Sequence, residues 1–478
     1  MELLVTPRAM GEADRRTIAA GTPVAVLMER AGRAVAWKLR HVLGSCRGRR
    51  VVLVCGKGNN GGDGLVTASA LRAWGARVAV FELAHGVDRS AFAREIGRAD
   101  AVVDAMYGTG FTGELRDDAA FVAGVFDAFT GSVVAVDVPS GIDGLTGEAR
   151  GVAVRATHTV TFAARKPGLV FEPGHSYAGE VTVAEIGIDL GDTAAHAVVL
   201  SADDVRAILA PRAAAAHKWQ SGVFVVGGSR GMTGAPMFVS HAAMRAGAGI
   251  VWCGLPGDGA ARAASGTEVI TKALPASDDG LLTTTGADVV LADVERFRAL
   301  AVGPGLGTGE DVHLAVHRIV AGAAVPLVLD ADGLNALEGR LATLHSRTAP
   351  TVITPHEGEY RRLTGHDVGP DRLAAAHELA TASGVVVLLK GPGTVIADPT
   401  GATVVNSTGG AALATAGSGD VLTGIIAGFL ARGLAAFEAA AVGAWVHGAV
   451  ADRFAREVGP GLVASDLIAG LPSTLASL

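Results

Sequence analysis

The 478-residue sequence predicts an α/β protein of two domains, and three observations carry this prediction. Short, almost continuously apolar segments alternate with amphipathic ones, as in parallel sheets covered by helices on both faces. Two glycine-rich segments of different composition lie far apart, at 56–64 and 414–420. The chain is also longer than a single hydrophobic core ordinarily supports. We therefore expect one domain over 1–205 and a second over 206–478.

The first domain opens with a predicted helix over 10–43, because apolar residues recur there every three or four positions. Short, β-rich and nearly uniformly apolar segments follow at 51–55, 77–82, 101–105 and 133–137. Strands of a parallel sheet that is covered on both faces have this character. The region up to about residue 190 is therefore predicted to be a Rossmann-like, doubly wound domain.

The second domain follows a stretch at 191–217 that ends in proline and alanine residues. Its predicted strands and the loops after them lie at 223–228, 300–305, 326–333, 351–359 and 385–393. Two alanine-rich helices close the chain, and Arg432 and Glu438 interrupt their apolar run. These two charges favour buried helices over a membrane span.

Composition excludes several classes of protein. Apolar residues make up 49% of the chain and charged residues 18%, which is the balance of a globular protein. The net charge of −7, without a basic tract, argues against nucleic-acid binding. Cys46, Cys55 and Cys253 form no CxxC pair, so neither a disulfide framework nor a zinc site is expected. The start of the chain lacks a signal pattern, and we expect a cytoplasmic protein with no membrane partner.

The first candidate site begins at GNNGGDG (58–64), between a predicted strand and a helix predicted at 62–74. The motif is not the GxGxxG fingerprint of dinucleotide binding. Its glycines allow a tight turn and a close approach of the backbone, while Asn59, Asn60 and Asp63 supply oxygen atoms.

Further polar residues follow later strands of the same domain. Asp104 ends one apolar strand, and Asp137 and Ser140 follow the next. One such aspartate could simply cap a helix. Several at successive strand ends favour a shared crevice, because the carboxyl ends of parallel strands meet at one edge of a sheet.

Residues 5–190 resemble the YjeF N-terminal family, the NAD(P)H-hydrate epimerases. The resemblance rests on the opening segment 10–32 and on GNNGGDG, DAMYGTGFTGE (104–114) and DVPSGIDG (137–144). It implies a potassium ion held by Asn60, Asp104 and Ser140, and oxygen ligands of this kind suit a hard cation. It also implies a hydrate pocket lined by Asp137 and two loops: Asn59, Asn60, Gly61, Gly62 and Asp63; Gly108, Thr109, Gly110, Phe111, Thr112, Gly113 and Glu114. Epimerisation requires an acid/base group, for which we predict Asp137.

The second candidate site is AGSGD (416–420), which opens a predicted helix. The amides of 417–419 would form an anion hole for a transferring phosphoryl group. Asp420 beside them is placed to take a proton from a substrate hydroxyl. A plain capped helix would give the same short motif. Further glycine-rich or polar loops favour the site, and they lie at 227–236, 303–307, 330–337, 354–359 and 390–394.

From about His217 to residue 470 the chain resembles the ribokinase-like fold, and within it the ADP-dependent NAD(P)H-hydrate dehydratases (YjeF C-terminal family). This resemblance implies that ADP, with Mg²⁺, phosphorylates the hydrate hydroxyl and that phosphate then leaves, with Asp420 as the base. It implies nucleotide contacts from Lys390, Gly391, Pro392, Gly393, Thr394 and Gly419, and hydrate contacts from Ala235, Gly305, His356 and Asp420. His356 could instead cap the helix that begins at Glu357.

Two segments depart from the usual pattern of this family. HKWQSG (217–222) stands where HKGxxG is usual, and STGGAALATAGSGD (407–420) lacks the usual Asn-Pro. The preference for ADP over ATP therefore stays open, as does that between NADH hydrate and NADPH hydrate. Lys218, Gly222 and Asp420 are retained.

The leading hypothesis is a bifunctional metabolite-repair enzyme that epimerises hydrated NADH and NADPH and dehydrates the S form at the expense of ADP. One alternative is a ribokinase-like kinase of small alcohols with a regulatory first half. Another is that the first half is a binding or scaffold module, which the presence of Asp104 and Asp137 disfavours. Families of this kind are usually oligomeric, so we expect a homo-oligomer whose ligands are small molecules.

Overall fold

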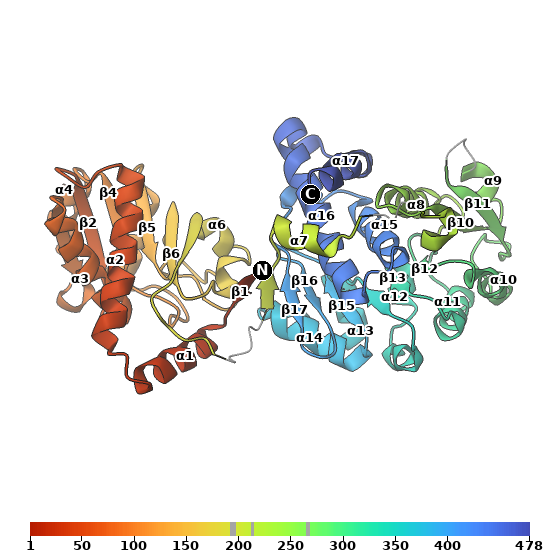
Figure 1. Ribbon diagram of the computed structural model, residues 1–478, viewed down its shortest axis with the longest axis horizontal. Helices are drawn as coiled ribbons and strands as arrows, with labels where there is room; N and C mark the ends of the chain where they lie inside the picture. Colours follow the sequence, from red (N-terminus) through yellow and green to blue (C-terminus); the bar gives the residue numbers. More distant parts are fainter. Residues whose placement is uncertain (192–196, 212–214, 264–267) are drawn as a thin grey trace. The chain divides into compact units, whose positions relative to one another are not determined.

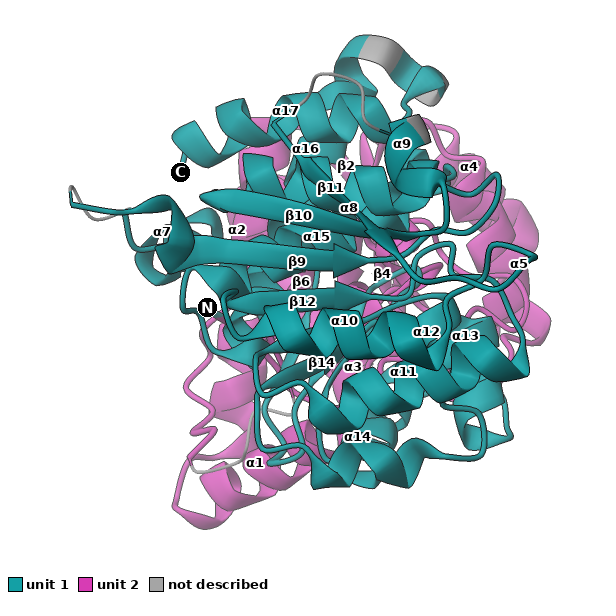
Figure 2. Ribbon diagram, turned by 90° about the vertical axis from the view of Figure 1, so that its right-hand side faces the viewer, with its two compact units in different colours: residues 1, 199–478 teal, residues 2–198 magenta. Residues whose placement is uncertain are grey.

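A computed structural model gives the structure of the chain and describes residues 1–191, 197–211, 215–263 and 268–478. The described chain divides into two compact units, shown in different colours in Figure 2. The N-terminal unit is Glu2–Val198, and the C-terminal unit is Met1 with Val199–Leu478. The boundary expected at 205/206 falls within helix α7 (Ala202–Ile208).

The N-terminal unit is built on a sheet in which every neighbouring pair of strands is parallel. Its strand order is β3-β2-β4-β5-β6-β7, so the chain passes to both sides of β2. This confirms the predicted doubly wound α/β fold, whose ligand crevice lies beyond the carboxyl ends of the strands. The strands are β2 (Arg50–Cys55), β3 (Arg77–Glu82), β4 (Ala101–Ala105), β5 (Ser132–Val136), β6 (His158–Phe162) and β7 (Glu180–Ala184).

Two helix predictions in this unit were wrong in their bounds. The helix predicted over 10–43 is two helices, α1 (Pro7–Ala19) and α2 (Val24–Leu43). Gly21 between them has a φ of 105°, and Pro23 presets the entry to α2, so the backbone cannot continue as one helix. Helix α3 (Asn59–Ala73) begins three residues before the predicted 62, which puts both asparagines in its first turn.

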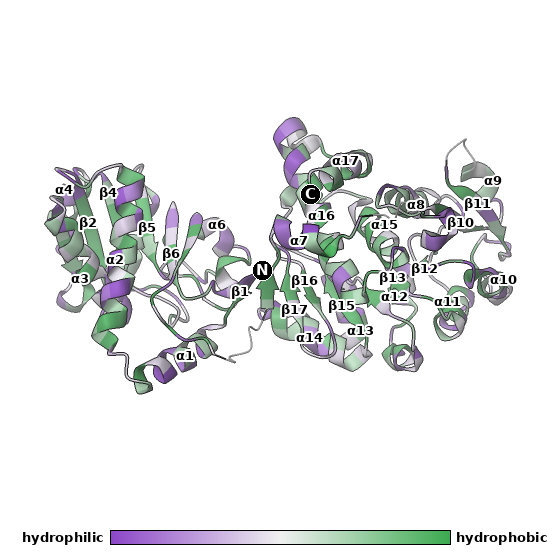
Figure 3. Cartoon of the chain, viewed as in Figure 1, coloured by the Kyte–Doolittle hydropathy of each residue, from purple (hydrophilic) through white to green (hydrophobic). Residues whose placement is uncertain are grey.

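The remaining helices of the unit are shorter. They are η1 (Leu83–His85), α4 (Arg89–Ile96), α5 (Asp117–Asp127), η2 (Pro167–Leu169) and α6 (Gly174–Ala178). Two apolar cores cover the sheet, one formed with α2 and α3 and the other with α4 and α5. Figure 3 shows the central strands in the hydrophobic colour. Because both faces of the sheet are covered, the sequences of these strands do not alternate between apolar and polar residues.

The C-terminal unit contains a larger sheet, in which the strand order β17-β16-β15-β14-β13-β12-β9-β10-β11 is found. Strands β15 to β11 in this order are parallel, and β16 and β17 are antiparallel additions next to β15. The bounds are β9 (Gly222–Val226), β10 (Ile250–Pro256), β11 (Ile270–Leu274), β12 (Ala299–Val302), β13 (Leu327–Leu329), β14 (Thr351–Ile353), β15 (Val386–Leu389), β16 (Val395–Ala397) and β17 (Thr403–Val405). The short strands β1 (Glu2–Leu4) and β8 (Ala197–Val199) lie at the chain start and at the division of the units.

Helix α15 (Ser418–Ala431) is central to this unit (Figure 1). It packs against α8 (Gly234–Arg245), α16 (Ala436–Val458), β12 and β13, and nearly all its residues are buried. The two predicted alanine-rich helices are therefore core helices, as expected. The other helices are η3 (Lys218–Ser221), α9 (Gly259–Ala263), α10 (Thr284–Val294), α11 (Glu310–Gly322), α12 (Asp332–Asn335), η4 (Leu341–Ser346), α13 (Glu357–Thr364), α14 (Arg372–Ser383), η5 (Ala411–Leu413), η6 (Gly459–Gly461) and α17 (Ala464–Ala476).

Within the described part of the chain, no helix is long and apolar enough to cross a membrane. Cys46, Cys55 and Cys253 are buried free thiols.

Candidate active sites

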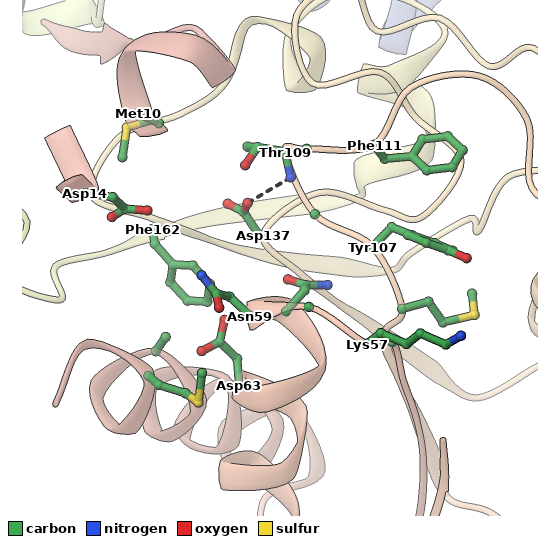
Figure 4. Close-up of a pocket in the computed structure, with 18 of the residues that line it drawn as sticks. Met10, Asp14, Lys57, Asn59, Asp63, Tyr107, Thr109, Phe111, Asp137 and Phe162 are labelled. Carbon is green, nitrogen blue, oxygen red and sulfur yellow. Dashed lines mark hydrogen bonds between the residues drawn. The ribbon is translucent and has the colours of Figure 1, made fainter. Parts of the chain in front are cut away.

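A cavity of about 850 Å³ opens in the N-terminal unit beyond the carboxyl ends of β2, β4, β5 and β6 (Figure 4). The first turn of α3, the loop after β4 and Asp137 form its polar wall. Apolar side chains of α2, among them Leu27 and Met28, also line it. The position follows from the parallel sheet, because all these loops leave the same edge.

The structure brings most of the predicted first-site residues to this cavity. Its lining includes Asn59, Asn60, Asp63, Gly108, Thr109, Gly110, Phe111, Thr112 and Asp137. Gly61, Gly62, Gly113 and Glu114 are not among the lining residues. A Cβ on Gly61 would overlap the carbonyl oxygen of Gly56, and one on Gly62 would meet Met28, so these two glycines serve close packing.

Asp137 follows β5 directly and lies in the left-handed region with a φ of 68°, which is uncommon for a residue other than glycine. One of its oxygens lies 2.7 Å from the ammonium of Lys166 and accepts a hydrogen bond of 3.0 Å from Thr161. The other accepts from the Thr109 amide at 3.2 Å (Figure 4). Burial opposes ionisation of Asp137, but Lys166 and these hydrogen bonds outweigh it and lower its pKa.

Lys166 is itself buried, with a side-chain exposure of 2%. Its ammonium donates to the Thr161 hydroxyl at 2.8 Å and to the Phe162 carbonyl at 2.9 Å, in addition to its ion pair with Asp137. These contacts satisfy the ammonium and fix the carboxylate of Asp137 at the cavity wall. Asp137 is therefore ionised at neutral pH, the state in which it can accept a proton.

Asp63 is in the opposite electrostatic state. Burial is the main reason that its pKa is raised to about 8, and the charges of Asp137 and Asp14 add to the effect. Burial also raises the pKa of Asp14, which lies on α1 and faces the same cavity. Asp14, Asp63 and Asp137 thus interact within one cavity that is also lined by Asp117 and Asp118, and Asp63 keeps its proton near neutral pH.

Asp104 lies below the cavity on β4 and is completely buried. Its carboxylate accepts from the Ser140 amide at 2.7 Å, the Ser140 hydroxyl at 2.6 Å and the Met106 amide at 3.2 Å. Burial nevertheless raises the pKa of Asp104 to about 6, since the hydrogen bonds only partly offset it. The structure thus joins Asp104 and Ser140, as the sequence predicted for neighbouring strand ends.

In the C-terminal unit the predicted second-site loops also leave one edge of the sheet. Asp330 follows β13, His356 follows β14 and Lys390 follows β15, and these three strands are neighbours. Gly305 lies in the loop after β12 and accepts a hydrogen bond from Ser229 through its carbonyl at 2.9 Å. Ala235 lies in the first turn of α8, which packs against α15.

Asp420 stands in the first turn of α15, and Gly417 before it has a φ of 85°. Burial raises the pKa of Asp420 to about 7, with a further contribution from Asp330 that Lys390 partly offsets. A carboxylate with a pKa near the working pH is well matched to general-base catalysis. The amides at the start of α15 lie beside it, as expected of a cradle for an anion, and that of Ser418 donates to the Thr415 carbonyl at 3.3 Å.

Lys390 connects the groups around Asp420. Its ammonium lies 2.7 Å from an Asp330 oxygen and 3.6 Å from a Glu359 oxygen, and both carboxylates are buried. Asp330 also accepts a hydrogen bond of 2.7 Å from Thr423 on α15. A Cβ on Gly419 would lie 3.7 Å from the Lys390 ammonium, so the helix start and the cation are close together.

His356 caps α13, the reading that the sequence had left open. Its Nδ1 accepts from the amides of Gly358 and Glu359 at 3.0 and 3.2 Å. This fixes Nδ1 as an acceptor and leaves the proton on Nε2, on a side chain that is 54% exposed. Nε2 lies 3.4 Å from a Glu359 carboxylate oxygen. Residues 391–394 form the turn between β15 and β16, where Thr394 donates to the Gly391 carbonyl at 3.2 Å.

Comparisons with known proteins agree with both halves. Residues 223–473 match the NAD(P)H-hydrate dehydratase family, and residues 24–95 and 85–168 match the family of YjeF-related protein N-termini. A bifunctional NAD(P)H-hydrate repair enzyme of Moorella thermoacetica is 41% identical, covering 99% of this chain and 97% of its own length. The corresponding enzyme of Mycobacterium leprae is 38% identical, covering 97% of each chain.

This chain belongs to the bifunctional NAD(P)H-hydrate repair family. Among solved structures, an ADP/ATP-dependent NAD(P)H-hydrate dehydratase from Bacillus subtilis, co-crystallised with ATP and Mg²⁺, is 32% identical. It covers 59% of this chain and 98% of its own, with a TM-score of 0.52. A ribokinase-like superfamily protein of Enterococcus faecalis, 24% identical with a TM-score of 0.51, covers 59% of this chain and 96% of its own. The ribokinase-like fold predicted for the second half is confirmed.

Three groups lie at the sites of this repair-family chain without having been predicted as individual site residues. Lys166 pairs with Asp137, Asp14 faces the first cavity, and Asp330 pairs with Lys390. Lys166 and Asp330 each follow an apolar strand, which was the available signal. Their partners are distant in sequence, so the pairings could not be read from it.

Proposed function

We propose that this chain repairs hydrated NADH and NADPH, with epimerisation in the N-terminal unit and ADP-dependent dehydration in the C-terminal unit. The observation that carries the proposal is the similarity of full-length repair enzymes across both units, each of which holds a separate acidic site. Epimerisation of the R hydrate supplies the S hydrate that dehydration consumes.

In the proposed epimerase site the hydrate occupies the cavity between α2 and the first turn of α3. Asp137 faces the carbon that carries the hydroxyl and the ring nitrogen, and it takes the proton of that hydroxyl. Lys166 and Thr161 keep the carboxylate ionised, which is the state that a base requires. Asn59 and residues 108–112 provide amide and backbone groups for the rest of the substrate.

We assign the potassium ion to Asn60, Asp104 and Ser140. The residues fit such an ion: Asp104 is a buried carboxylate whose hydrogen bonds do not compensate its burial, and a cation would. The Asn60 Nδ2 is buried without a hydrogen-bond partner, and the flipped amide would present an oxygen in its place. The ion would supply positive charge under the polar wall of the cavity.

In the proposed dehydratase site Asp420 takes the proton of the hydrate hydroxyl as that oxygen attacks the β-phosphoryl group of ADP, which releases AMP. The new phosphate ester then loses phosphate, together with a proton from the adjacent carbon, and the nicotinamide ring is restored. Phosphate is a far better leaving group than hydroxide. The amides of 417–419 stabilise charge on the transferring group, and Lys390 adds a cation beside Gly419.

Magnesium fits this site only in company with the nucleotide. Among the described residues, no group of three or more acidic, histidine or cysteine side chains is placed to hold a metal ion. Mg²⁺ commonly binds through nucleotide phosphates and water, with few protein ligands. The ion would neutralise phosphate charge there. Glu357 and Glu359 lie in the first turn of α13, which follows β14 at the same edge of the sheet.

The experiment that tests the proposal follows the absorbance of reduced nicotinamide in an R/S mixture of NADH hydrate with purified full-length protein, Mg²⁺ and K⁺. Parallel reactions contain ADP, ATP or no nucleotide. Recovery beyond the S fraction, faster than spontaneous epimerisation and dependent on nucleotide, is the expected result. Recovery that stops at the S fraction would remove the epimerase assignment, and no recovery with either nucleotide would remove the dehydratase assignment.

A further inference from the structure

We propose that Asp63 is a second catalytic residue of the epimerase cavity, the proton donor that works opposite the base Asp137. The inference rests on the proposed epimerase function and extends it by assigning the other half of the proton transfer. Asp63 lies in the first turn of α3, and Figure 4 shows its carboxyl group reaching from that helix toward the space that Asp137 and Asp14 also face.

The first observation is the missing partner of the Asp63 carboxyl. The residue is 8% exposed and lines the cavity. No hydrogen bond or ion pair joins its carboxyl oxygens to another group in the described parts of the chain, although its backbone carbonyl accepts from Thr67 at 2.8 Å. The Asp63 oxygens are not among the fully buried atoms that lack a partner, so the carboxyl is open to a molecule in the cavity.

The second observation is the charge of the surroundings. Asp14 faces Asp63 from α1, Asp137 from the end of β5 and Lys166 from the loop after β6, while the cavity-lining residues of α2 are apolar. Lys57 lies in the loop just before α3. Lys166 is bound to Asp137 at 2.7 Å, so its charge is already compensated. Asp63 therefore holds its proton, with a pKa raised to about 8 by burial and by the neighbouring carboxylates.

The two aspartates have the complementary states that an acid/base pair requires. The buried ammonium of Lys166 keeps the Asp137 carboxyl ionised, whereas burial without a paired cation keeps the Asp63 carboxyl protonated. Environments that separate the pKa values of two neighbouring carboxyl groups commonly distinguish the acid from the base. Asp14 is less buried than Asp63, and burial raises its pKa as well. The negative charge of its carboxylate contributes to the raised pKa of Asp63.

The step that this pair would perform is a reversible ring opening. Asp137 takes the proton of the hydroxyl, whose oxygen becomes an aldehyde carbonyl as the bond from carbon to ring nitrogen breaks. The electron pair of that bond goes to the nitrogen, which takes the proton from Asp63. Rotation of the aldehyde presents its other face, and the reverse transfers close the ring and return both protons. No oxidant or reductant is needed.

The test uses Asp63→Asn in the full-length protein, because asparagine keeps the shape and cannot supply the proton. In an R/S mixture the S hydrate is converted to NADH first, and the slower recovery of NADH from the R hydrate reports epimerisation. The rate of NADH recovery from pure S hydrate reports dehydration alone. We expect the slow phase to fall by about 10²- to 10⁴-fold and the S reaction to be unchanged. Asp127→Asn, on the exposed end of α5, is the matched control and should retain both rates.

The pH profile separates a proton donor from a structural residue. In the wild type the epimerisation rate should fall as pH rises through about 8, because a donor is active in its protonated form. In Asp63→Asn this alkaline limb should be absent from the residual rate. A wild-type rate that stays constant across this range overturns the inference even if the variant fails to fold.

The outcomes also distinguish this inference from the proposed function. If the wild type shows no slow phase beyond spontaneous epimerisation, the epimerase assignment itself fails. If the wild type shows that phase and Asp63→Asn matches it in rate and pH profile, only the role of Asp63 is refuted. A thermal melting curve of the variant that matches the wild type assigns any loss of rate to chemistry.

Discussion

Replacing Asp420 with asparagine should stop dehydration while leaving epimerisation intact. Asp420 lies in the first turn of α15, beside the amides of the helix start. Asparagine preserves the shape of the side chain but cannot accept the substrate proton. Loss of a general base lowers a rate by about 10²- to 10⁴-fold, which corresponds to roughly 3 to 5 kcal/mol in the barrier.

The structure also predicts the pH dependence of the wild-type reaction. Burial and Asp330 raise the pKa of Asp420 to about 7. The base acts when ionised, so the rate on the S hydrate should rise with pH through this value. About one tenth of the carboxylate is ionised one pH unit below the pKa and about nine tenths one unit above it, so the rate should change by about tenfold over that interval.

The assay follows reduced nicotinamide released from pure S hydrate with saturating ADP and Mg²⁺, across that pH interval. Asp311→Asn is the matched control, because Asp311 is an exposed acid in the first turn of α11. The Asp311→Asn substitution removes the same favourable interaction between an acidic side chain and the helix dipole, worth about 0.3–1 kcal/mol, and it leaves the site unchanged. Its rate and pH profile should match the wild type.

Two results would refute this reasoning. Asp420→Asn with more than about a tenth of the wild-type rate would mean that Asp420 is not the base, since that loss lies far below the usual contribution. Asp420→Asn could instead have low activity and still show the wild-type rise of rate with pH. That rise would then belong to another group and not to the raised pKa of Asp420.

Three further outcomes are expected. Asp137→Asn should slow the use of R hydrate by about 10²- to 10⁴-fold and leave the S reaction unchanged; equal rates on R hydrate in variant and wild type would exclude Asp137 as the base. Replacing K⁺ with tetramethylammonium should slow epimerisation and spare dehydration, whereas an unchanged slow phase would count against a potassium site at Asp104. Gly424→Ala should lower the melting temperature of the protein, because a Cβ there would overlap the Val239 carbonyl where α15 packs on α8, at a cost of about 1–3 kcal/mol. Gly124→Ala in α5, where a Cβ meets nothing within 4 Å, should leave it unchanged or raise it.

The sequence was sufficient to predict the architecture of both units. Strands such as β4 and β12 are buried on both faces, and their uniform apolarity records that burial directly. Helix bounds were less predictable where a local backbone conformation decided them. The break at Gly21 and the early start of α3 at Asn59 depend on φ values and packing that periodicity does not contain.

The sequence also predicted which residues would gather at each site, because the fold itself brings strand ends together. Asp104 and Ser140, separated by 36 positions, share two hydrogen bonds as that rule requires. The rule does not say which side chain pairs with which. Lys166 was not predicted as a site residue, and Lys390 was predicted only as a nucleotide contact. In the structure Lys166 pairs with Asp137, and Lys390 pairs with Asp330.

By itself, then, the amino-acid sequence determined the α/β class, the two-unit organisation, the family and the identity of the polar residues at the sheet edges. Only the tertiary structure decided their protonation. Asp63, Asp137, Asp330 and Asp420 are the same residue type, yet the pKa is raised for Asp63 and Asp420 and lowered for Asp137 and Asp330. The physical reason is that a pKa depends on burial and on the distance to other charges. Those distances exist only once the chain has folded.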